Sequence, residues 1–71
     1  MKANIPKLKG KIVESNTTQE GLAAEIGMHR TTFYRKMKGA GGGFTLQEMW
    51  DIVESLKLDR LETQKIFLCI E

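Results

Sequence analysis

The stretch QEGLAAEIGMHRTTFYRKMKG, residues Gln19–Gly39, decides the fold of this chain. Its first part places Leu22, Ala23 and Ile26 at the three- and four-residue spacing of a helix that buries one face. Gly27 follows, where the end of a helix favours a residue that tolerates a positive φ. The pattern therefore predicts a short helix that ends in a tight turn.

A second short helix follows the turn. Phe33 and Met37 lie four residues apart and form its apolar face. The opposite face carries polar and cationic side chains, from Arg30, Thr31, Tyr34 and Arg35. A helix with an apolar back and this front is suited to press on a polar, negatively charged surface.

This spacing resembles the helix-turn-helix of the Cro/repressor family of phage and bacterial regulators. The matching residues are Gln19, Ala23, Gly27, Met28 and Phe33, and the resemblance spans roughly Leu8 to Leu58. It implies a compact all-α domain of four to five helices, similar to the lambda repressor, over residues 1–71, with the helix-turn-helix at 19–38. In that family the second helix enters the DNA major groove and the first crosses the backbone. Lys36 and Thr17 depart from the family pattern, which places apolar residues there.

The resemblance also implies which residues contact DNA. Arg can donate two hydrogen bonds to guanine, and Thr can contact a base or a thymine methyl group. Tyr34 has two alternatives, a thymine methyl group or a phosphate. The base contacts are expected from Arg30, Thr31, Tyr34 and Arg35, and the phosphate contacts from Thr18, Gln19, His29, Lys36, Lys38 and Thr45.

The charge distribution agrees with a DNA-binding surface in the first half. Residues 1–38 carry eight Lys/Arg and three Glu, whereas residues 39–71 carry three Lys/Arg and six acidic residues. The lysines at positions 2, 7, 9 and 11 can steer toward DNA or simply be exposed. The basic half thus contains the candidate recognition helix, as a phosphate-binding face requires.

The composition argues against several other classes of protein. A chain of 71 residues predicts one domain, and its single cysteine, Cys69, can form neither an internal disulfide nor a metal cluster. The sequence has no long apolar run and no signal-peptide pattern, so we expect no membrane contact and a location in the cytoplasm or nucleoid of a bacterial host. The glycines of residues 39–43 lack the Lys-Ser/Thr and the preceding strand of a nucleotide-binding loop. We expect no cofactor, no metal and no small-molecule ligand.

Capping residues define the remaining elements. Thr18 is a natural N-cap, and Thr17 with Glu20 is an alternative capping box one residue earlier. Thr45 and Glu48 form a second capping-box pattern. Gly21 permits close approach either to a neighbouring side chain or to the DNA backbone. The predicted helices are Lys7–Ser15, Gln19–Ile26, Arg30–Lys38, Leu46–Leu56 and Arg60–Leu68.

The C-terminal half predicts a core and a dimer contact. Trp50 borders the apolar face of its helix, and we expect it in the core, with a subunit contact as the alternative. Leu61 and Phe67 are expected to close the core. The segment 60–71 is too apolar for a free end, and it is assigned to a homodimer contact, as a helix or a short paired strand, or to the core of the monomer. The dimer-contact residues are Ile66, Leu68 and Ile70. The apolar helical faces comprise Leu8 and Ile12 flanked by Val13, and Leu46, Met49, Ile52, Val53 and Leu56.

Two function classes remain. The first is a sequence-specific DNA-binding transcriptional regulator, a Cro-like phage or prophage repressor that binds a double-stranded operator as a homodimer. The second is a protein-interaction module on the same fold, such as an antitoxin. An enzyme is not expected, because no nucleophile–base or carboxylate pair is recognisable. Non-specific architectural binding lacks the exposed wedge residues that such proteins insert.

Overall fold

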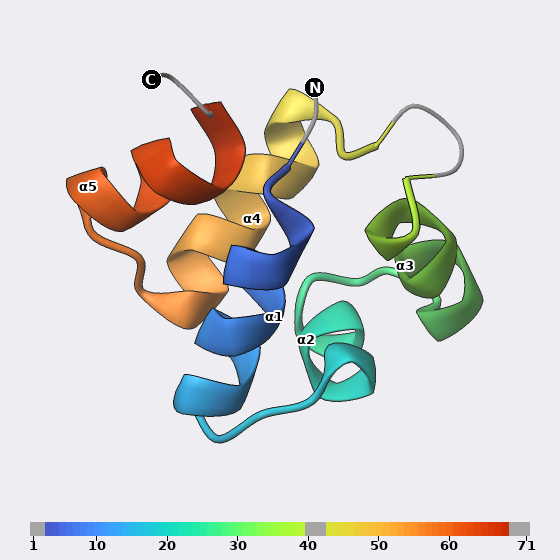
Figure 1. The fold of residues 1–71 in the computed structure, drawn as a ribbon. Helices are drawn as coiled ribbons and strands as arrows, with labels where there is room; N and C mark the ends of the chain where they lie inside the picture. Colours follow the sequence, from blue (N-terminus) through green and yellow to red (C-terminus); the bar gives the residue numbers. More distant parts are fainter. Residues whose placement is uncertain (1–2, 40–42, 69–71) are drawn as a thin grey trace.

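The computed structural model describes residues 3–39 and 43–68, with the backbone alone at Leu68. The described part is helical, without strands, and compact, with a Cα radius of gyration of 10.8 Å (Figure 1). The elements are α1 (Ile5–Glu14), α2 (Gln19–Glu25), α3 (Arg30–Met37), α4 (Leu46–Leu56), α5 (Arg60–Thr63) and a π-helical turn η2 (Gln64–Leu68). The predicted all-α class is confirmed.

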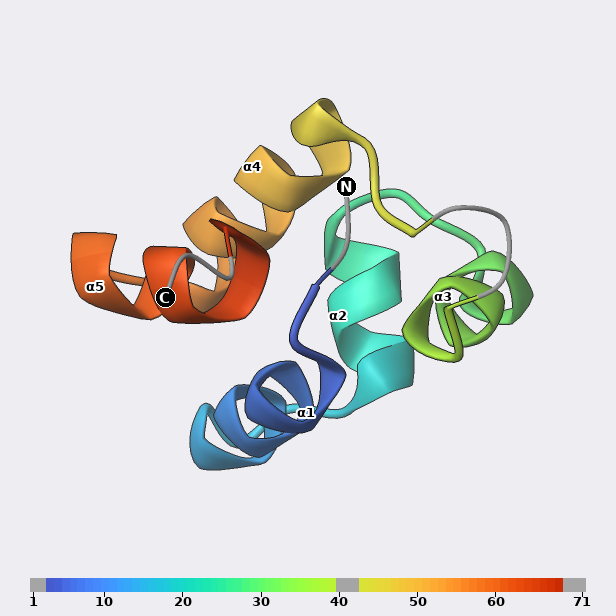
Figure 2. The same ribbon diagram turned by 45° about the horizontal axis from the view of Figure 1, so that its top comes forward.

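The helices are arranged so that α3 and α5 lie at opposite ends of the molecule. Both views place α1, α2 and α4 between them (Figures 1 and 2). The helix that carries the polar, cationic front is therefore remote from α5.

Helix α1 begins earlier than the sequence predicts. Asn4 is its N-cap, with the Asn4 side-chain oxygen 3.2 Å from the Lys7 amide nitrogen. Pro6 lies inside the first turn, where its missing N–H has no partner to lose. The predicted start at Lys7 was two residues late because the cap precedes the proline.

The start of α2 decides between the two predicted caps. Thr18 Oγ1 accepts a hydrogen bond of 3.0 Å from the Gly21 amide, so the later cap is used. A Cβ atom at Gly21 would lie 2.8 Å from Thr17 Oγ1 and 3.3 Å from Thr18 Oγ1. Glycine at this position therefore lets the two threonine hydroxyls approach the helix.

Capping boxes open both C-terminal helices. Thr45 and Glu48 cap α4 reciprocally, as predicted, and Asp59 and Glu62 cap α5 in the same way. Lys57 ends α4 in the left-handed conformation, with φ 55°. The predicted bounds of α4 are confirmed.

A cluster of apolar side chains from α1, α2, α3, α4 and η2, together with Phe44 and Leu58, forms the core. Phe44, directly before α4, lies between Phe33 of α3 and Phe67 of η2, with ring centroids 5.6 Å and 6.3 Å away. These offset and edge-on arrangements suit aromatic pairs. The buried set is Leu8, Ile12, Leu22, Ala23, Phe33, Met37, Phe44, Met49, Ile52, Leu56, Leu58, Ile66 and Phe67.

Four apolar residues expected at or beside the core are instead exposed. Once Thr45 fixes the start of α4, Met49, Ile52 and Leu56 face inward at the i, i+3, i+7 spacing. Leu46 and Trp50, four residues apart, then share the outer face. Leu58 and Thr63 occupy the inner positions near Leu61. The exposed fractions are 57% for Leu46, 52% for Trp50, 57% for Leu61 and 73% for Val13.

The C-terminal segment differs from its prediction in form and in exposure. The helix predicted over Arg60–Leu68 changes to π-helical hydrogen bonding after Thr63. Phe67 is buried as predicted, but Ile66, assigned to a dimer surface, is only 3% exposed. The Ile66 carbonyl also accepts a 2.5 Å hydrogen bond from the Asn4 amide. Ile66 is therefore a core residue, because η2 packs against the start of α1. The Leu68 side chain, Cys69 and Ile70 lie outside the described residues.

Candidate nucleic-acid interface

The turn between α2 and α3 holds the two helices in a fixed relation. The Met28 amide donates a 2.8 Å hydrogen bond to the Ala23 carbonyl, and Gly27 between them has φ 75°. Ala23 is buried where the helices meet, so its small side chain permits close packing. His29 then caps α3, with its Nδ1 atom accepting a 3.2 Å hydrogen bond from the Thr31 amide. This frame leaves the outer face of α3 uncovered.

The outer face of α3 carries the predicted base-contact residues. Phe33 and Met37 are buried, which turns the other side of the helix to solvent. No acidic residue occurs within α3, and its last turn is basic. The exposed side chains are Arg30, Thr31, Thr32, Tyr34, Arg35 and Lys38. The four predicted base-contact residues are thus all exposed on one helix.

A hollow beside α3 is lined in part by Lys9, a residue that the sequence did not distinguish from the other N-terminal lysines. The hollow has a volume of about 250 Å³ and is lined by Lys9 of α1, Gln19 of α2, and Tyr34, Met37 and Lys38 at the end of α3. Two ammonium groups, an amide and a phenol from three helices can together donate hydrogen bonds to the oxygens of a phosphate. Lys9 was one of four N-terminal lysines in the sequence, and only the tertiary structure shows that it lines the same hollow as Tyr34 and Lys38.

Two cations of α3 are paired with carboxylates from other helices. Arg30 lies 3.1 Å from Glu20 Oε2 on α2, and both side chains are more than half exposed. Lys36 lies 2.7 Å from Glu48 Oε1 on α4, and its side chain is only 17% exposed. The structure therefore gives Lys36, expected on a phosphate, an internal partner. Within the part of the chain that the structure describes, Arg35 and Lys38 have no ion pair.

The Glu48 carboxylate links the end of α3 to the start of α4. Partial burial raises the pKa of Glu48, but hydrogen bonds from the Lys36 ammonium and the Thr45 amide outweigh it and hold the pKa below its ordinary value of 4.5. A carboxylate with a lowered pKa stabilises the fold above its unfolded-state pKa and loses this contribution as pH falls through the folded-state value. Deprotonated Glu48 thus fastens α3 to α4.

We expect Lys36→Gln to lower the free energy of unfolding by about 1 kcal/mol at neutral pH. The substitution leaves a half-buried carboxylate without its cation. The deficit should shrink only as pH falls through the folded-state pKa of Glu48, which lies below 4.5, because protonation of Glu48 removes the ion pair from the wild-type protein. Urea unfolding of both proteins, followed by circular dichroism from pH 7 to pH 3, measures the difference in their free energies of unfolding. Arg35→Gln is the matched control, and a deficit that is independent of pH would contradict the role of the ion pair.

The capping side chains among the predicted phosphate contacts already have backbone partners. Thr18 and Thr45 accept hydrogen bonds from the Gly21 and Glu48 amides, and His29 accepts one from Thr31. Their hydroxyl protons and the second imidazole nitrogen are still available to a ligand. Gln19 lines the hollow next to α3 and is half-buried.

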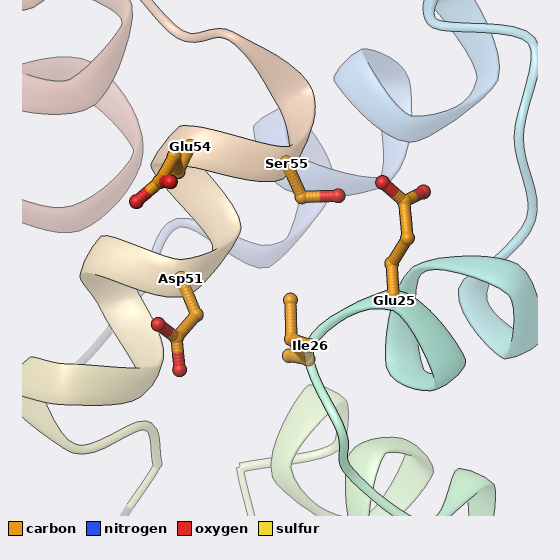
Figure 3. A pocket seen from close by; sticks show the side chains of 5 residues that line it. All are labelled: Glu25, Ile26, Asp51, Glu54 and Ser55. Carbon is orange, nitrogen blue, oxygen red and sulfur yellow. The ribbon is translucent and has the colours of Figure 1, made fainter.

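An acidic hollow lies between α2 and α4. Figure 3 shows Asp51 and Glu54 extending from α4 and Glu25 from the end of α2, around Ile26. None of these three carboxylates is in an ion pair with a described residue. No three or more His, Cys, Asp or Glu side chains among residues 3–39 and 43–68 are arranged so that they could hold a metal ion. This hollow repels phosphate, so the negative and positive surfaces of the molecule are separate.

No protein-family model, curated protein or solved structure matches this chain. None of the helices in the described ranges has the length and apolar character that crossing a lipid bilayer requires.

Proposed function

We propose that this chain is a sequence-specific DNA-binding regulator that uses α2 and α3 as a helix-turn-helix of the Cro/repressor type. The observation that carries the proposal is the outer face of α3, which is exposed, free of acidic residues and rich in Arg, Thr and Tyr. In this arrangement α3 enters the major groove and Arg30, Thr31, Tyr34 and Arg35 contact base edges. Occupancy of an operator then blocks a promoter, as with Cro-like phage or prophage repressors.

The phosphate contacts flank α3 on both sides. Lys9, Gln19 and Lys38 converge on the hollow next to α3, which supports one backbone contact there. Thr45 opens α4, an 11-residue helix, on the side of α3 where Lys36 and Glu48 meet. Lys36 is not included, because Glu48 holds its ammonium and little of its side chain is exposed.

A second copy of the chain is the proposed partner on the operator. Small DNA-binding domains of this kind usually pair on two-fold symmetric sites. With Ile66 buried, the exposed apolar residues of α4 and α5 among those described are Leu46, Trp50 and Leu61, and Val13 is exposed on α1. The same exposed surface is what favours the second candidate function, a protein-interaction module such as an antitoxin.

The test of the proposal is selection of random duplex DNA by the purified protein at about 0.15 M salt. Enrichment of a two-fold symmetric motif is the expected result, and the spacing of its half-sites reports the separation of the two α3 helices. Absence of any enriched motif would overturn the proposal and favour the interaction module.

Lys9→Gln and Lys38→Gln should each reduce the salt dependence of DNA binding by about 0.9 in log–log slope. Each substitution removes one of the two ammonium groups that would neutralise phosphate charge at the hollow next to α3. The loss of affinity should be similar on selected and random duplexes, because phosphate contacts carry no sequence information. Fluorescence anisotropy over a salt series measures the slope. Lys65→Gln, in η2 at the far end of the molecule, is the control, and an unchanged slope in both variants would remove the hollow from the interface.

A further inference from the structure

We infer that Glu20 is a specificity-determining residue, which reserves Arg30 for base edges and disfavours its contact with backbone phosphates. The inference rests on the proposed function and concerns how the same surface distinguishes one sequence from another. The observation behind it is the ion pair between the carboxylate of Glu20 on α2 and the guanidinium of Arg30, the first cation of α3.

The geometry makes Glu20 part of the surface that meets DNA. Its Oε2 atom lies 3.1 Å from Nη1 of Arg30, although the two residues are ten positions apart in the chain. The exposed fractions of the two side chains are 57% for Glu20 and 63% for Arg30. Any ligand that reaches the Arg30 guanidinium therefore also meets the Glu20 carboxylate.

The ion pair has little structural importance. Exposed pairs of this kind contribute about 0–1 kcal/mol to stability. Buried Leu22, Ala23 and Phe33 already hold α2 against α3, independently of the pair. Glu20 can therefore be changed without loss of the fold, and its effect on binding is separable from its effect on stability.

The pair affects phosphate and guanine differently. A phosphate beside Arg30 is repelled by Glu20, and the arginine charge that would neutralise it is already compensated. Guanine offers two uncharged acceptors, N7 and O6. The guanidinium has five N–H donors, so it can donate to guanine along one edge while another edge stays hydrogen-bonded to the Glu20 carboxylate. Glu20 thus weakens non-specific binding more than binding at a site with guanine in register.

The second cation pair of α3 acts in the same direction. Glu48 compensates Lys36, so two of the four cations at positions 30, 35, 36 and 38 are neutralised by other helices. Non-specific affinity depends on the number of cations available to phosphates. The affinity of α3 for random DNA is therefore lower than its basic sequence suggests.

The test is Glu20→Gln, measured on the selected duplex and on a random duplex over a salt series. We expect affinity for random DNA to rise about three- to five-fold and its log–log salt slope to steepen by about 0.9, because one more cation becomes available to phosphate. Affinity for the selected duplex should change less than two-fold, so the ratio of specific to random affinity falls.

Two controls separate this effect from net charge and from folding. Glu25→Gln makes the same charge change at the other end of α2, on the acidic hollow, and should leave the ratio unchanged. In an Arg30→Gln background, Glu20→Gln should have no effect on the ratio, because the carboxylate acts through Arg30. Circular dichroism melting of each variant confirms that it is folded.

Equal gains for Glu20→Gln and Glu25→Gln would overturn the inference, because only net charge would then matter. A fall in specific affinity without a rise in random affinity would also overturn it. Both results leave the proposed function intact, provided that the wild-type protein enriches a motif. If the wild-type protein binds no duplex at all, the proposed function fails and this inference with it.

Discussion

Phe44→Ala should remove about 3–5 kcal/mol from the free energy of unfolding at 25 °C. Phe44 is 2% exposed and its ring contacts both Phe33 and Phe67, so truncation breaks two aromatic pairs and opens a cavity between α3 and η2. A domain of 71 residues has a total stability of roughly 4–10 kcal/mol, of which this loss is a large part. Urea unfolding followed by circular dichroism measures the change.

Two further variants make this result interpretable. Phe44→Leu keeps most of the volume and should cost no more than about 1.5 kcal/mol. Leu46→Ala removes a neighbouring apolar side chain that is 57% exposed and should change stability by less than about 0.5 kcal/mol. If Phe44→Ala and Leu46→Ala had equal effects, Phe44 would not be the residue that joins α3 to the C-terminal elements.

Arg30→Ala should weaken binding to the selected duplex by about 1–3 kcal/mol, which is roughly 5- to 150-fold, and abolish base preference at one position of each half-site. The physical reason is the loss of two parallel hydrogen bonds to a guanine edge. Random duplex should be affected less, because Glu20 already compensates the Arg30 charge. Anisotropy titrations and a repeated selection with the variant measure both effects.

The matched control is Arg60→Ala, which removes an exposed arginine from α5 at the opposite end of the molecule. It should alter neither affinity nor base preference. An equal loss on selected and random duplexes for Arg30→Ala would place Arg30 on a phosphate instead of a base.

Much of the local structure was predictable from the sequence. Thr18, His29, Thr45 and Asp59 cap helices whose hydrogen bonds lie within three residues of the cap. Such contacts depend on neighbours in the chain, so residue type and spacing suffice to find them. The exposed polar face of α3 was predictable for a related reason, since burial of Phe33 and Met37 turns the rest of that helix outward.

The candidate site was only partly predictable. The sequence predicted that Arg30, Thr31, Tyr34 and Arg35 share the outer face of α3, where they are exposed, but it did not predict that Lys36 pairs with Glu48. Residue spacing along one helix gives no information about a carboxylate contributed by another helix, and the Lys36–Glu48 pair spans twelve positions. Lys9 was likewise indistinguishable in the sequence from its neighbouring lysines, and only the tertiary structure places it on the hollow with Tyr34 and Lys38.

The sequence by itself determined the all-α class of the fold, the starts of α2, α3, α4 and α5, and the composition of the outer face of α3, because these follow from hydrogen bonds and periodicity within a few residues. Only the tertiary structure decided that Trp50 and Leu61 are exposed while Leu58 and Ile66 are buried. It alone decided that Glu20 and Glu48 compensate two cations of α3. The physical reason is that burial and ion pairing depend on which helix packs against each face, and that choice is made by the whole core rather than by any one segment.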